Sequence, residues 1–544
     1  MNIFRLFSAS DRGAIREVLG VTGLAGLANV VLLSLINMAS GLAAAGQPVG
    51  VRPVLMFLVA VGIYFLTNRA SLSGANALLQ QRLADLKLEI ADGIRRSPLR
   101  TLEEMGRGEI YTILAQETNY LSQVFPLLVA AAQGLFLVVF CLAYIAILSQ
   151  DSFVIISFFS AVGVLFFWIR RLRLTRDLAS VHEREAAMLQ SLSHFSEGFP
   201  ELRLNADRND ALFRRFARIV GDLETEVVRI GKDWVVLILF SNAFLYAMLG
   251  IVVFVLPAFL DGYSDTIYKI TAAAIFCIGP VLGVFAVAHI HSRAEIGLGH
   301  VYWLQERLAK GATDMGASAV EPGAFADFRE IALDGVEFQY EDAQGAVSFR
   351  TGPWDLTIRR GELLMLRGGN GVGKSTTLKL LCGLYRPSAG VIRVDGVAVD
   401  DGNLQRYREI FSAIFADFHL FDRLHGLETA DPERVRALIE RMQLTAKVGF
   451  AGGRFTTQDL STGQRKRLAM IVALLEDRPV HIFDEWAADQ DAHFRERFYT
   501  EILPDLRRQG KSVIVVTHDD LYWDLADRVI TLEFGAIVAT PGRL

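Results

Sequence analysis

Six apolar runs of membrane-spanning length constrain this chain more than any other feature. Each is close to the roughly 20 residues that a helix needs to cross the hydrocarbon core of a bilayer. The runs lie at about 20–45, 53–74, 124–148, 153–169, 234–256 and 267–290. With 52% hydrophobic and 21% charged residues, the 544-residue chain is too apolar for a soluble protein of this size. The sequence therefore predicts an all-α membrane domain of six spans within residues 1–310.

The connections between the runs alternate between short and long. Those at 46–52, 149–152 and 261–265 are short, whereas 75–123 and 170–233 are long, charged and helical in pattern. Lys and Arg number three before the first run, six and twelve in the long connections, and one in the short loops together. Because basic residues stay on the cytoplasmic side, both termini and both long connections are predicted to be cytoplasmic. Such long extensions suit contact with a cytoplasmic motor domain.

The composition changes after residue 310. Residues 311–327 are rich in Gly and Ala and are predicted to form a linker. Within 328–544, short Val/Ile/Leu strands at 361–366, 480–483 and 512–516 alternate with helical patterns, which predicts an α/β domain. The net charge of −5 provides no basic field, so no nucleic-acid partner is expected. The three cysteines lack metal-ligand spacing and are predicted to be reduced packing residues.

A phosphate-binding motif follows the strand at 361–366. It fits the pattern G-x-x-x-x-G-K-[ST] and leads into a helical segment, which is the context that the motif requires. Its residues are Gly368, Gly369, Asn370, Gly371, Val372, Gly373, Lys374, Ser375 and, in the helix, Thr376. The glycines let backbone N–H groups surround the phosphates of ATP, Lys374 is expected to reach the β and γ oxygens, and Ser375 to bind Mg²⁺. A chance Gly-rich turn is the alternative.

Two carboxylates end the apolar strand at 480–483. Asp484 is predicted to hold the Mg²⁺ shell, and Glu485 to orient and deprotonate the water that attacks the γ-phosphate. Acidic residues also end strands merely to meet solvent. Together with the phosphate-binding motif, the pair predicts ATP hydrolysis with ATP and Mg²⁺ as cofactors.

The segment Leu460-Ser461-Thr462-Gly463-Gln464 resembles the LSGGQ signature of ABC proteins, with Thr462 in place of the first glycine. The resemblance implies that Ser461, Gly463 and Gln464 face the γ-phosphate held by a second subunit. Two ATP molecules would then lie between two copies of the chain in a homodimer. The alternative for Ser461 is an ordinary helix cap.

Three further positions match the same family. The resemblance implies that Tyr340 stacks on adenine, that His518 contacts the γ-phosphate, and that Asp491 lies at the dimer interface. A core tyrosine is the alternative for Tyr340. The family's fold, a type I exporter (type IV ABC) membrane domain fused to an α/β P-loop ATPase domain, is therefore expected.

The chain departs from the family where most members have a glutamine that joins the metal to the membrane helices. Ala416 stands at that position, and Asp417 is a candidate to supply the polar group as a metal ligand; an ordinary turn residue is the alternative. The acidic motif common before the signature in multidrug-type exporters is also missing from 450–459. By resemblance, coupling helices are expected near 109–117 and 195–203.

The segments 411–421, 483–491 and 197–205 resemble the cyclic-peptide and peptide-siderophore exporter branch, which includes exporters of microcin J25, syringomycin and the pyoverdine precursor. That branch implies export of a peptide-like product across a bacterial inner membrane. Lipid or multidrug export is the nearest alternative. Siderophore import, a soluble ABC regulator or repair ATPase, and a nucleotide-gated channel or scaffold are the others.

Polar side chains within the apolar runs are costly if they face lipid. Five are candidates to line a substrate cavity: Asn29, Asn37, Arg69, Gln133 and Asn242. Hydrogen bonds between helices, or snorkelling to a membrane face, are the alternatives for each.

Overall fold

The chain forms two compact units in the computed structural model. One comprises Met1–Ile90 and Gly108–Gln305, and the other comprises Ala91–Arg107 and Glu306–Leu544. The structure describes residues 5–7, 12–259, 267–311, 321, 323–341 and 346–538. Most of the predicted linker, 312–320 and 322, lies outside the described residues. The short stretch 91–107 is thus grouped with the C-terminal part of the chain, far from it in sequence.

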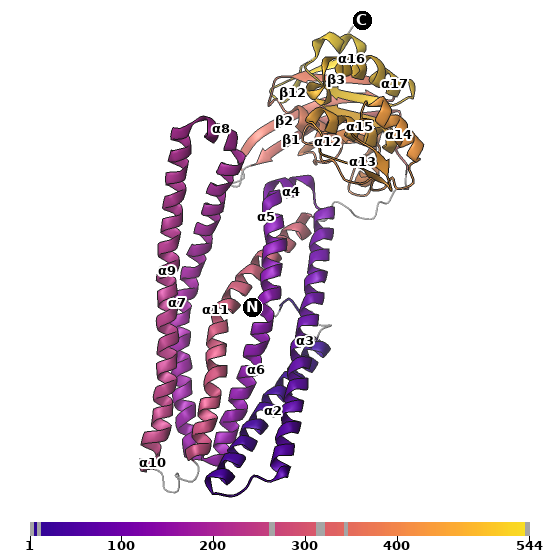
Figure 1. The fold of residues 1–544 in the computed structure, drawn as a ribbon. Helices are drawn as coiled ribbons and strands as arrows, with labels where there is room; N and C mark the ends of the chain where they lie inside the picture. Colours follow the sequence, from indigo (N-terminus) through magenta and orange to yellow (C-terminus); the bar gives the residue numbers. More distant parts are fainter. Residues whose placement is uncertain are drawn as a thin grey trace. The chain divides into compact units, whose positions relative to one another are not determined.

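Long helices build the membrane unit (Figure 1). Among the described residues, six helical segments are long and apolar enough to cross a membrane, in agreement with the six apolar runs. The long helices are α2 (Arg12–Ala44), α3 (Val51–Arg96), α6 (Thr118–Leu148), α7 (Gln150–Glu197), α9 (Ala206–Gly250) and α11 (Ile267–Gly311). Shorter pieces extend them: α5 (Arg107–Thr112) and a π-helical turn at Ile113–Glu117 precede α6, and a π-helical turn at Ile251–Val255 and α10 (Leu256–Phe259) follow α9.

Local side chains set where two of the long helices begin. Ser149 precedes α7, and its hydroxyl accepts a hydrogen bond from the Ser152 N–H at 3.3 Å. Asn205 precedes α9 and accepts from the Arg208 N–H at 3.0 Å. Each bond satisfies one of the N–H groups that a helix leaves free at its start. The short helix α8 (Phe199–Leu204) joins α7 to α9, which run side by side in Figure 1.

Small residues allow the membrane helices to pack closely. A Cβ added at Gly134 of α6 would lie 3.3 Å from both Cβ and the carbonyl oxygen of Pro280 in α11. A Cβ at Gly26 of α2 would lie 3.0 Å from Phe136 Cβ. Close approach at small residues is a usual way for helices to associate in lipid. The resulting apolar core contains Cys141, which is fully buried; all three cysteines are free.

Two sheets organise the second unit, Ala91–Arg107 and Glu306–Leu544, which is called the ATPase unit because the sequence predicts ATP hydrolysis within it. The six-stranded sheet has the order β12-β11-β3-β10-β9-β6, with β12 antiparallel to β11 and the other pairs parallel. Its strands are β3 (Leu363–Gly368), β6 (Phe411–Ile414), β9 (Val480–Asp484), β10 (Ser512–Val516), β11 (Arg528–Glu533) and β12 (Ala536–Val538). The four-stranded antiparallel sheet, of order β2-β1-β4-β5, contains β1 (Glu330–Glu341), β2 (Val347–Arg359), β4 (Ala389–Val394) and β5 (Val397–Ala398). A two-residue hairpin pairs β7 (Phe450–Ala451) with β8 (Arg454–Phe455).

The parallel sheet is buried on both faces, because alternate side chains of each strand enter different cores. Leu364 and Leu366 of β3 pack with β1, β2, β4 and α12 (Lys374–Leu381). Leu363 and Met365 pack instead with the helices of the other face. Those helices are α14 (Pro432–Arg441), α15 (Thr462–Glu476), α16 (Ala492–Arg497) and α17 (Leu503–Arg508), with the π-helical turn Phe498–Ile502; α13 (Leu404–Arg408) belongs to the first core. Motif residues that follow β3, β9 and β10 thereby meet at the carboxyl edge of one sheet.

Candidate functional site

The phosphate-binding loop joins β3 to α12. Gly373 has φ of +97° and immediately precedes α12, in the left-handed region that glycine tolerates best. A Cβ at Gly368 would lie 2.5 Å from the Leu532 carbonyl oxygen, so the strand end has no room for a side chain. The first N–H groups of α12 have no partner within the helix, and they follow directly on the glycine loop. This is the arrangement that binds phosphate.

Lys374 lies at the centre of the site. Its side chain is buried, and its Nζ donates to the carbonyl oxygens of Gly368 and Gly369, at 3.1 Å each. The same Nζ is 3.2 Å from His518 Nε2 and 3.5 Å from Glu485 Oε1. Glu485 Oε1 is also 3.6 Å from His518 Nε2. Three side chains predicted from separate motifs thus form one cluster.

Ser375 and Asp484 form the adjoining oxygen pair. The Ser375 hydroxyl donates to Asp484 Oδ2 at 2.7 Å. Burial raises the pKa of Asp484, and the hydrogen bond from Ser375 opposes that rise. Asp484 Oδ1 is buried and has no hydrogen-bond partner among the described residues. A hydroxyl and a carboxylate with a free oxygen suit Mg²⁺, which binds oxygen ligands and shares its shell with phosphates.

Glu485 is held in a backbone conformation that is unfavourable for a residue with a side chain. Its φ is +48°, in the left-handed region. Its N–H donates to the Val516 carbonyl at 3.1 Å, and its own carbonyl accepts from Lys466 Nζ at 2.7 Å. Strain of this kind is retained where surrounding contacts hold it and is common at functional sites. Lys466, a buried side chain of α15 that also pairs with Asp489 at 2.7 Å, was not predicted from the sequence.

The signature residues do not join the Lys374 cluster. Ser461 caps α15, and Gln464 Oε1 accepts from the Ser461 N–H at 3.3 Å, which makes a reciprocal capping box. A Cβ at Gly463 would lie only 2.4 Å from the Asp489 carbonyl oxygen, so the glycine allows the loop after β9 to pack on α15. Gln464 Oε1 also accepts from Lys447 Nζ at 3.3 Å, and the Gly463 carbonyl accepts from Gln490 Nε2 at 3.1 Å.

Asp491 likewise acts locally. It caps α16 by accepting from the Phe494 N–H at 2.9 Å, and it pairs with Arg467 of α15. The hydrogen bond from Phe494, followed by the pairing with Arg467, lowers the pKa of Asp491. Within one chain, Ser461 and Asp491 are therefore helix caps.

Tyr340 lies at the end of β1 beside the phosphate-binding loop. Its hydroxyl is 3.5 Å from Thr376 Oγ1 and donates to the Tyr385 hydroxyl at 3.0 Å. The ring is half-buried and makes an edge contact with Phe338 at 5.0 Å. A partly exposed ring at this position is available to stack on a base.

Ala416 and Asp417, the residues at and after the expected glutamine position, have different surroundings. The backbone N–H of Ala416 is near enough to the Asp484 carboxyl to oppose the rise that burial causes in its pKa. The Asp417 side chain is exposed, and its charge acts on Lys379 of α12. The role of Asp417 as a metal ligand stays a prediction.

Two of the five cavity candidates make hydrogen bonds between helices. Gln133 donates to the Ser71 hydroxyl at 3.1 Å, and Ser71 bonds to Thr22 at 2.7 Å. Asn37 is buried and reaches the Lys269 carbonyl at 3.5 Å. Hydrogen bonding between helices therefore explains both of these amides. The remaining three differ in exposure: Arg69 is exposed, whereas Asn29 and Asn242 are half-buried.

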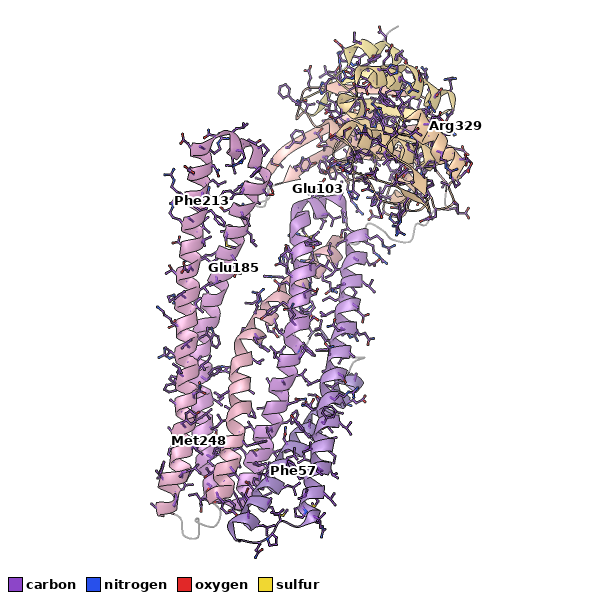
Figure 2. The ribbon with its side chains drawn as sticks, viewed as in Figure 1. Phe57, Glu103, Glu185, Phe213, Met248 and Arg329 are labelled. Atoms are coloured by element: carbon purple, nitrogen blue, oxygen red, sulfur yellow. The ribbon has the colours of Figure 1, made fainter. Side chains whose placement is uncertain are left out.

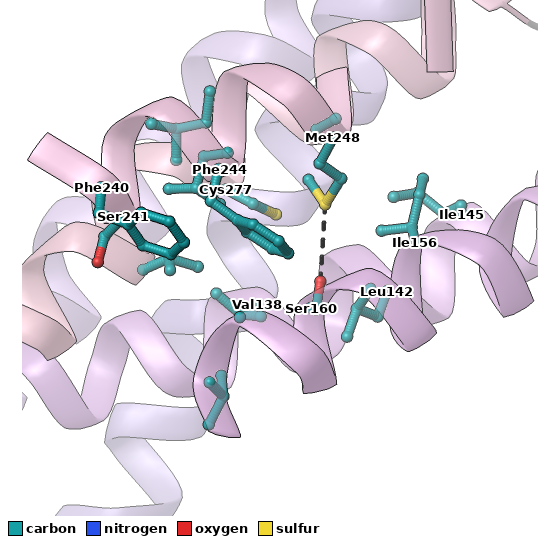
Figure 3. A pocket seen from close by; sticks show the side chains of 16 residues that line it. Val138, Leu142, Ile145, Ile156, Ser160, Phe240, Ser241, Phe244, Met248 and Cys277 are labelled. Atoms are coloured by element: carbon teal, nitrogen blue, oxygen red, sulfur yellow. Dashed lines mark hydrogen bonds between the residues drawn. The ribbon is translucent and has the colours of Figure 1, made fainter. Parts of the chain in front are cut away.

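An apolar cavity of about 100 Å³ lies elsewhere in the membrane unit, between α6, α7, α9 and α11 (Figure 3). Val138, Leu142, Ile156 and Phe244 are among its lining residues, and none of the five polar candidates lines it. Its few polar groups include Ser160, whose hydroxyl donates to Met248 Sδ at 3.7 Å. This cavity suits an apolar group rather than a charged one.

Comparisons with known proteins agree with this architecture. The ABC transporter family model matches residues 352–488. The ATP-binding protein SyrD of Pseudomonas syringae pv. syringae is 32% identical over 540 residues, which cover 95% of this chain and 93% of that protein. The macrolide export ATP-binding/permease protein MacB 1 of Yersinia pestis bv. Antiqua (strain Antiqua) is 33% identical over 229 residues, covering 39% of this chain and 34% of that protein.

A solved structure of a bacterial Atm1-family ABC exporter with ATP bound shares the fold. It has a TM-score of 0.76 and 15% identity, and the match covers 98% of this chain and 95% of that chain. The predicted fold class, six membrane helices joined to a P-loop ATPase domain, is confirmed. Since a relative that is 32% identical matches nearly the whole chain, we conclude that this protein belongs to the ABC transporter family, as an exporter-type half-transporter that couples ATP hydrolysis to transport across a membrane.

Proposed function

We propose that two copies of this chain export a peptide-type product from the cytoplasm across a bacterial inner membrane. The supporting observation is that the similarity to SyrD spans 95% of the chain and so includes the membrane helices, where a transporter meets its cargo. The match to MacB 1 covers 39% of the chain, too little to span both units. The segments that resemble the cyclic-peptide and peptide-siderophore branch favour a peptide cargo over other exported compounds.

Each ATP site would be completed by both copies. Lys374 and the glycine loop would hold the phosphates, with the partner subunit's Ser461 and the partner subunit's Gly463 closing over the γ-phosphate. Bound at Ser375 and Asp484, Mg²⁺ would neutralise charge on the phosphates. Tyr340 would stack on the adenine. The local caps described above place Ser461 at the exposed start of α15, where a second subunit can reach it.

Glu485 is the proposed general base. Its carboxylate lies 3.5 Å from Lys374 Nζ and 3.6 Å from His518, so a water activated there would be near the γ-phosphate bound by the same groups. ATP-driven closure would favour an outward-open membrane region, and hydrolysis would reverse it. Both termini and the ATPase domain would be cytoplasmic, and membrane lipid would surround the six spans.

The test uses the full-length protein reconstituted in proteoliposomes. ATPase stimulation is measured with a panel of cyclic peptides, peptide siderophores and lipids, alongside Glu485→Gln as the inactive control. Selective stimulation by a peptide, with ATP-dependent uptake of that peptide into inside-out vesicles, supports the proposal. Peptide-independent ATPase, with stimulation by lipids alone, contradicts it.

Lipid or multidrug export is the second candidate. The apolar cavity between α6, α7, α9 and α11 favours it, because its lining suits an acyl chain or another apolar group. Replacing Gly163, on the cavity wall, with a larger residue would distinguish the two. A Cβ there would lie 2.6 Å from the Phe244 ring, so the substitution alters the cavity directly. Loss of lipid stimulation with unchanged peptide stimulation would assign the cavity to lipid.

A further inference from the structure

His518 lies just past the end of β10, where the sheet no longer holds the backbone. The strand ends at Val516, and the Thr517 N–H still donates to the Leu366 carbonyl of β3 at 3.2 Å. His518 and Asp519 follow in a segment without regular secondary structure, and the His518 side chain is 51% exposed. Its ring nevertheless belongs to the hydrolytic cluster described above. Contacts from outside the sheet are therefore needed to fix its position.

Tyr499 supplies such contacts on both sides of His518. Its hydroxyl donates to Asp519 Oδ2 at 2.9 Å and is 2.6 Å from Thr517 Oγ1. Because a phenol has one hydrogen to give and the carboxylate takes it, the Thr517 hydroxyl is the donor of the second bond. Thr517 Oγ1 in turn accepts from the Asp519 N–H at 3.0 Å. The three bonds form a closed ring, which ties the residues before and after the histidine to one hydroxyl group.

Packing holds Tyr499 itself in place. Its side chain is fully buried in the core on the helical face of the parallel sheet. Its ring is stacked on Tyr522 with ring centroids 4.2 Å apart and planes 11° from parallel. It belongs to the π-helical turn Phe498–Ile502, an irregularity of a kind that is frequent at functional sites. Burial raises the pKa of Tyr499, so its hydroxyl stays protonated and remains a donor at neutral pH.

Arg495 adds a second contact to Asp519. It precedes Tyr499 by four residues, so the two side chains lie on the same side of the helix. Arg495 Nη1 is 3.6 Å from Asp519 Oδ1, whereas the Tyr499 hydroxyl binds Oδ2. Each carboxylate oxygen therefore has its own partner. The Asp519 side chain is 24% exposed, which partly shields these contacts from water.

We propose that Tyr499 is a positioning residue that fixes His518 relative to the γ-phosphate of ATP. It acts through the backbone on either side of the histidine, which its bonds to Thr517 and Asp519 hold. Such precision matters for hydrolysis, because a displacement of about 1 Å can lower a rate by about 10²-fold. The inference rests on the proposed contact of His518 with the γ-phosphate, and it adds to that site a residue that none of the sequence motifs contains.

Tyr499→Phe is the test variant, because it removes the hydroxyl and keeps the ring that stacks on Tyr522. Tyr522→Phe is its matched control. It removes a hydroxyl from the other ring of the same stack, and that hydroxyl makes no hydrogen bond in the described part of the chain. Thr517→Val opens the ring of hydrogen bonds at a second point and keeps the shape of the side chain, whereas Thr517→Ser retains the hydroxyl.

The measurement is the steady-state ATPase of the full-length protein in detergent, with kcat and the KM for ATP determined separately. Tyr499→Phe and Thr517→Val are expected to lower kcat by about 5- to 50-fold at a nearly unchanged KM, because a displaced His518 impairs hydrolysis more than binding. Tyr522→Phe and Thr517→Ser should keep kcat near that of the wild type.

A double variant separates positioning from a purely structural role. In the His518→Ala background there is no ring left to position, so adding Tyr499→Phe should change kcat by less than about twofold. If Tyr499 served only the fold, its substitution would lower kcat by the same factor in both backgrounds. Phosphate release from radiolabelled ATP is sensitive enough to follow the residual activity.

Three results overturn the proposal. The first is a wild-type kcat in Tyr499→Phe. The second is a full additional loss when Tyr499→Phe is combined with His518→Ala, which would assign Tyr499 to the fold. The third is near-normal hydrolysis by His518→Ala alone, which would remove the proposed role of His518 and, with it, the task of Tyr499. No cargo is needed for any of these measurements, so their failure is separate from failure of the peptide-export proposal.

Discussion

The two halves of the ATP site differ in how complete they are within one chain. Lys374, Glu485 and His518 already lie within 3.6 Å of one another. Ser461 and Asp491, by contrast, are occupied as caps of α15 and α16. The residues of the first half follow strands of one sheet and meet at its carboxyl edge. Those of the second half lie at the starts of α15 and α16. In the proposed dimer, a single chain would therefore build the hydrolytic half of each site and present the closing half to its partner.

The largest expected effect on ATP hydrolysis comes from the half that one chain assembles, the cluster of Lys374, Glu485 and His518, called the assembled half below. Glu485→Gln removes the proposed general base and should lower ATP hydrolysis by about 10²–10⁴-fold while leaving ATP binding intact. Steady-state ATPase and equilibrium binding of a fluorescent ATP analogue measure the two properties. Glu501→Gln, at an exposed pair with Arg497, is the matched control. Near-normal turnover in Glu485→Gln would show that another group activates the water.

Mixed dimers test directly whether the two halves of each ATP site come from different subunits. Lys374→Ala and Ser461→Arg each damage a different half, so each homodimer should be inactive. In a one-to-one mixture, half of the dimers contain one intact site, and ATPase should return to about a quarter of the wild-type rate if the sites act independently. Differently tagged copies, purified in sequence, isolate the mixed dimer. Absence of recovery in that purified dimer would contradict either composite sites or their independence.

Lys466 connects the two halves, and its removal should have an intermediate effect. Its Nζ holds the carbonyl of Glu485 at 2.7 Å from α15, the helix that carries the signature. Lys466→Met should lower kcat by about 10- to 100-fold through misplacement of Glu485. The KM for ATP should change little, because Lys466 has no contact with the phosphate-binding loop in the described part of the chain. Lys511→Met, which breaks the pair with Asp477, serves as the control.

The smallest effect concerns stability. Ser461→Ala removes the cap of α15 and should lower the free energy of unfolding by about 1 kcal/mol. Thermal unfolding of the nucleotide-free protein in detergent measures this cost, with Thr462→Ala as a neighbour that leaves the cap hydroxyl in place. An unchanged Tm would show that the capping box contributes nothing to the folded chain. In that case only ATPase would report a role for Ser461.

The sequence predicted the assembled half well because its chemistry is local. A glycine loop, a lysine and strand-terminal carboxylates keep their spacing whatever surrounds them, and parallel strands bring their carboxyl ends to one edge. Six apolar runs were likewise enough to place six membrane helices. The contacts of Lys466 with Glu485 and of Glu103 with Lys379 escaped prediction, because they form only in the folded chain. Glu103 meets Lys379 across 276 residues of sequence.

The sequence could not place the cavity for a related reason. Helices that are apolar on all sides carry no periodic signal for which face turns inward, so polar residues were the only guide. Gln133 and Asn37 instead bond between helices, and the observed cavity is lined by apolar side chains. Glu103 of α4 (Leu99–Met105), labelled in Figure 2, contacts Lys379, and the coupling segment expected at 109–117 stays a prediction.

The grouping of Ala91–Arg107 with the ATPase unit bears on how such exporters can recombine. Lys379 Nζ and the Tyr385 hydroxyl donate to Glu103 at 2.8 and 2.6 Å. A gene exchange that replaced only the C-terminal domain would leave Glu103 behind and bring the incoming domain against a foreign helix. Chimaeras joined at the linker should therefore lose the native contacts between 91–107 and the ATPase unit, whereas chimaeras that also carry 91–107 should keep them. The part of the gene that encodes the complete ATPase unit is therefore discontinuous.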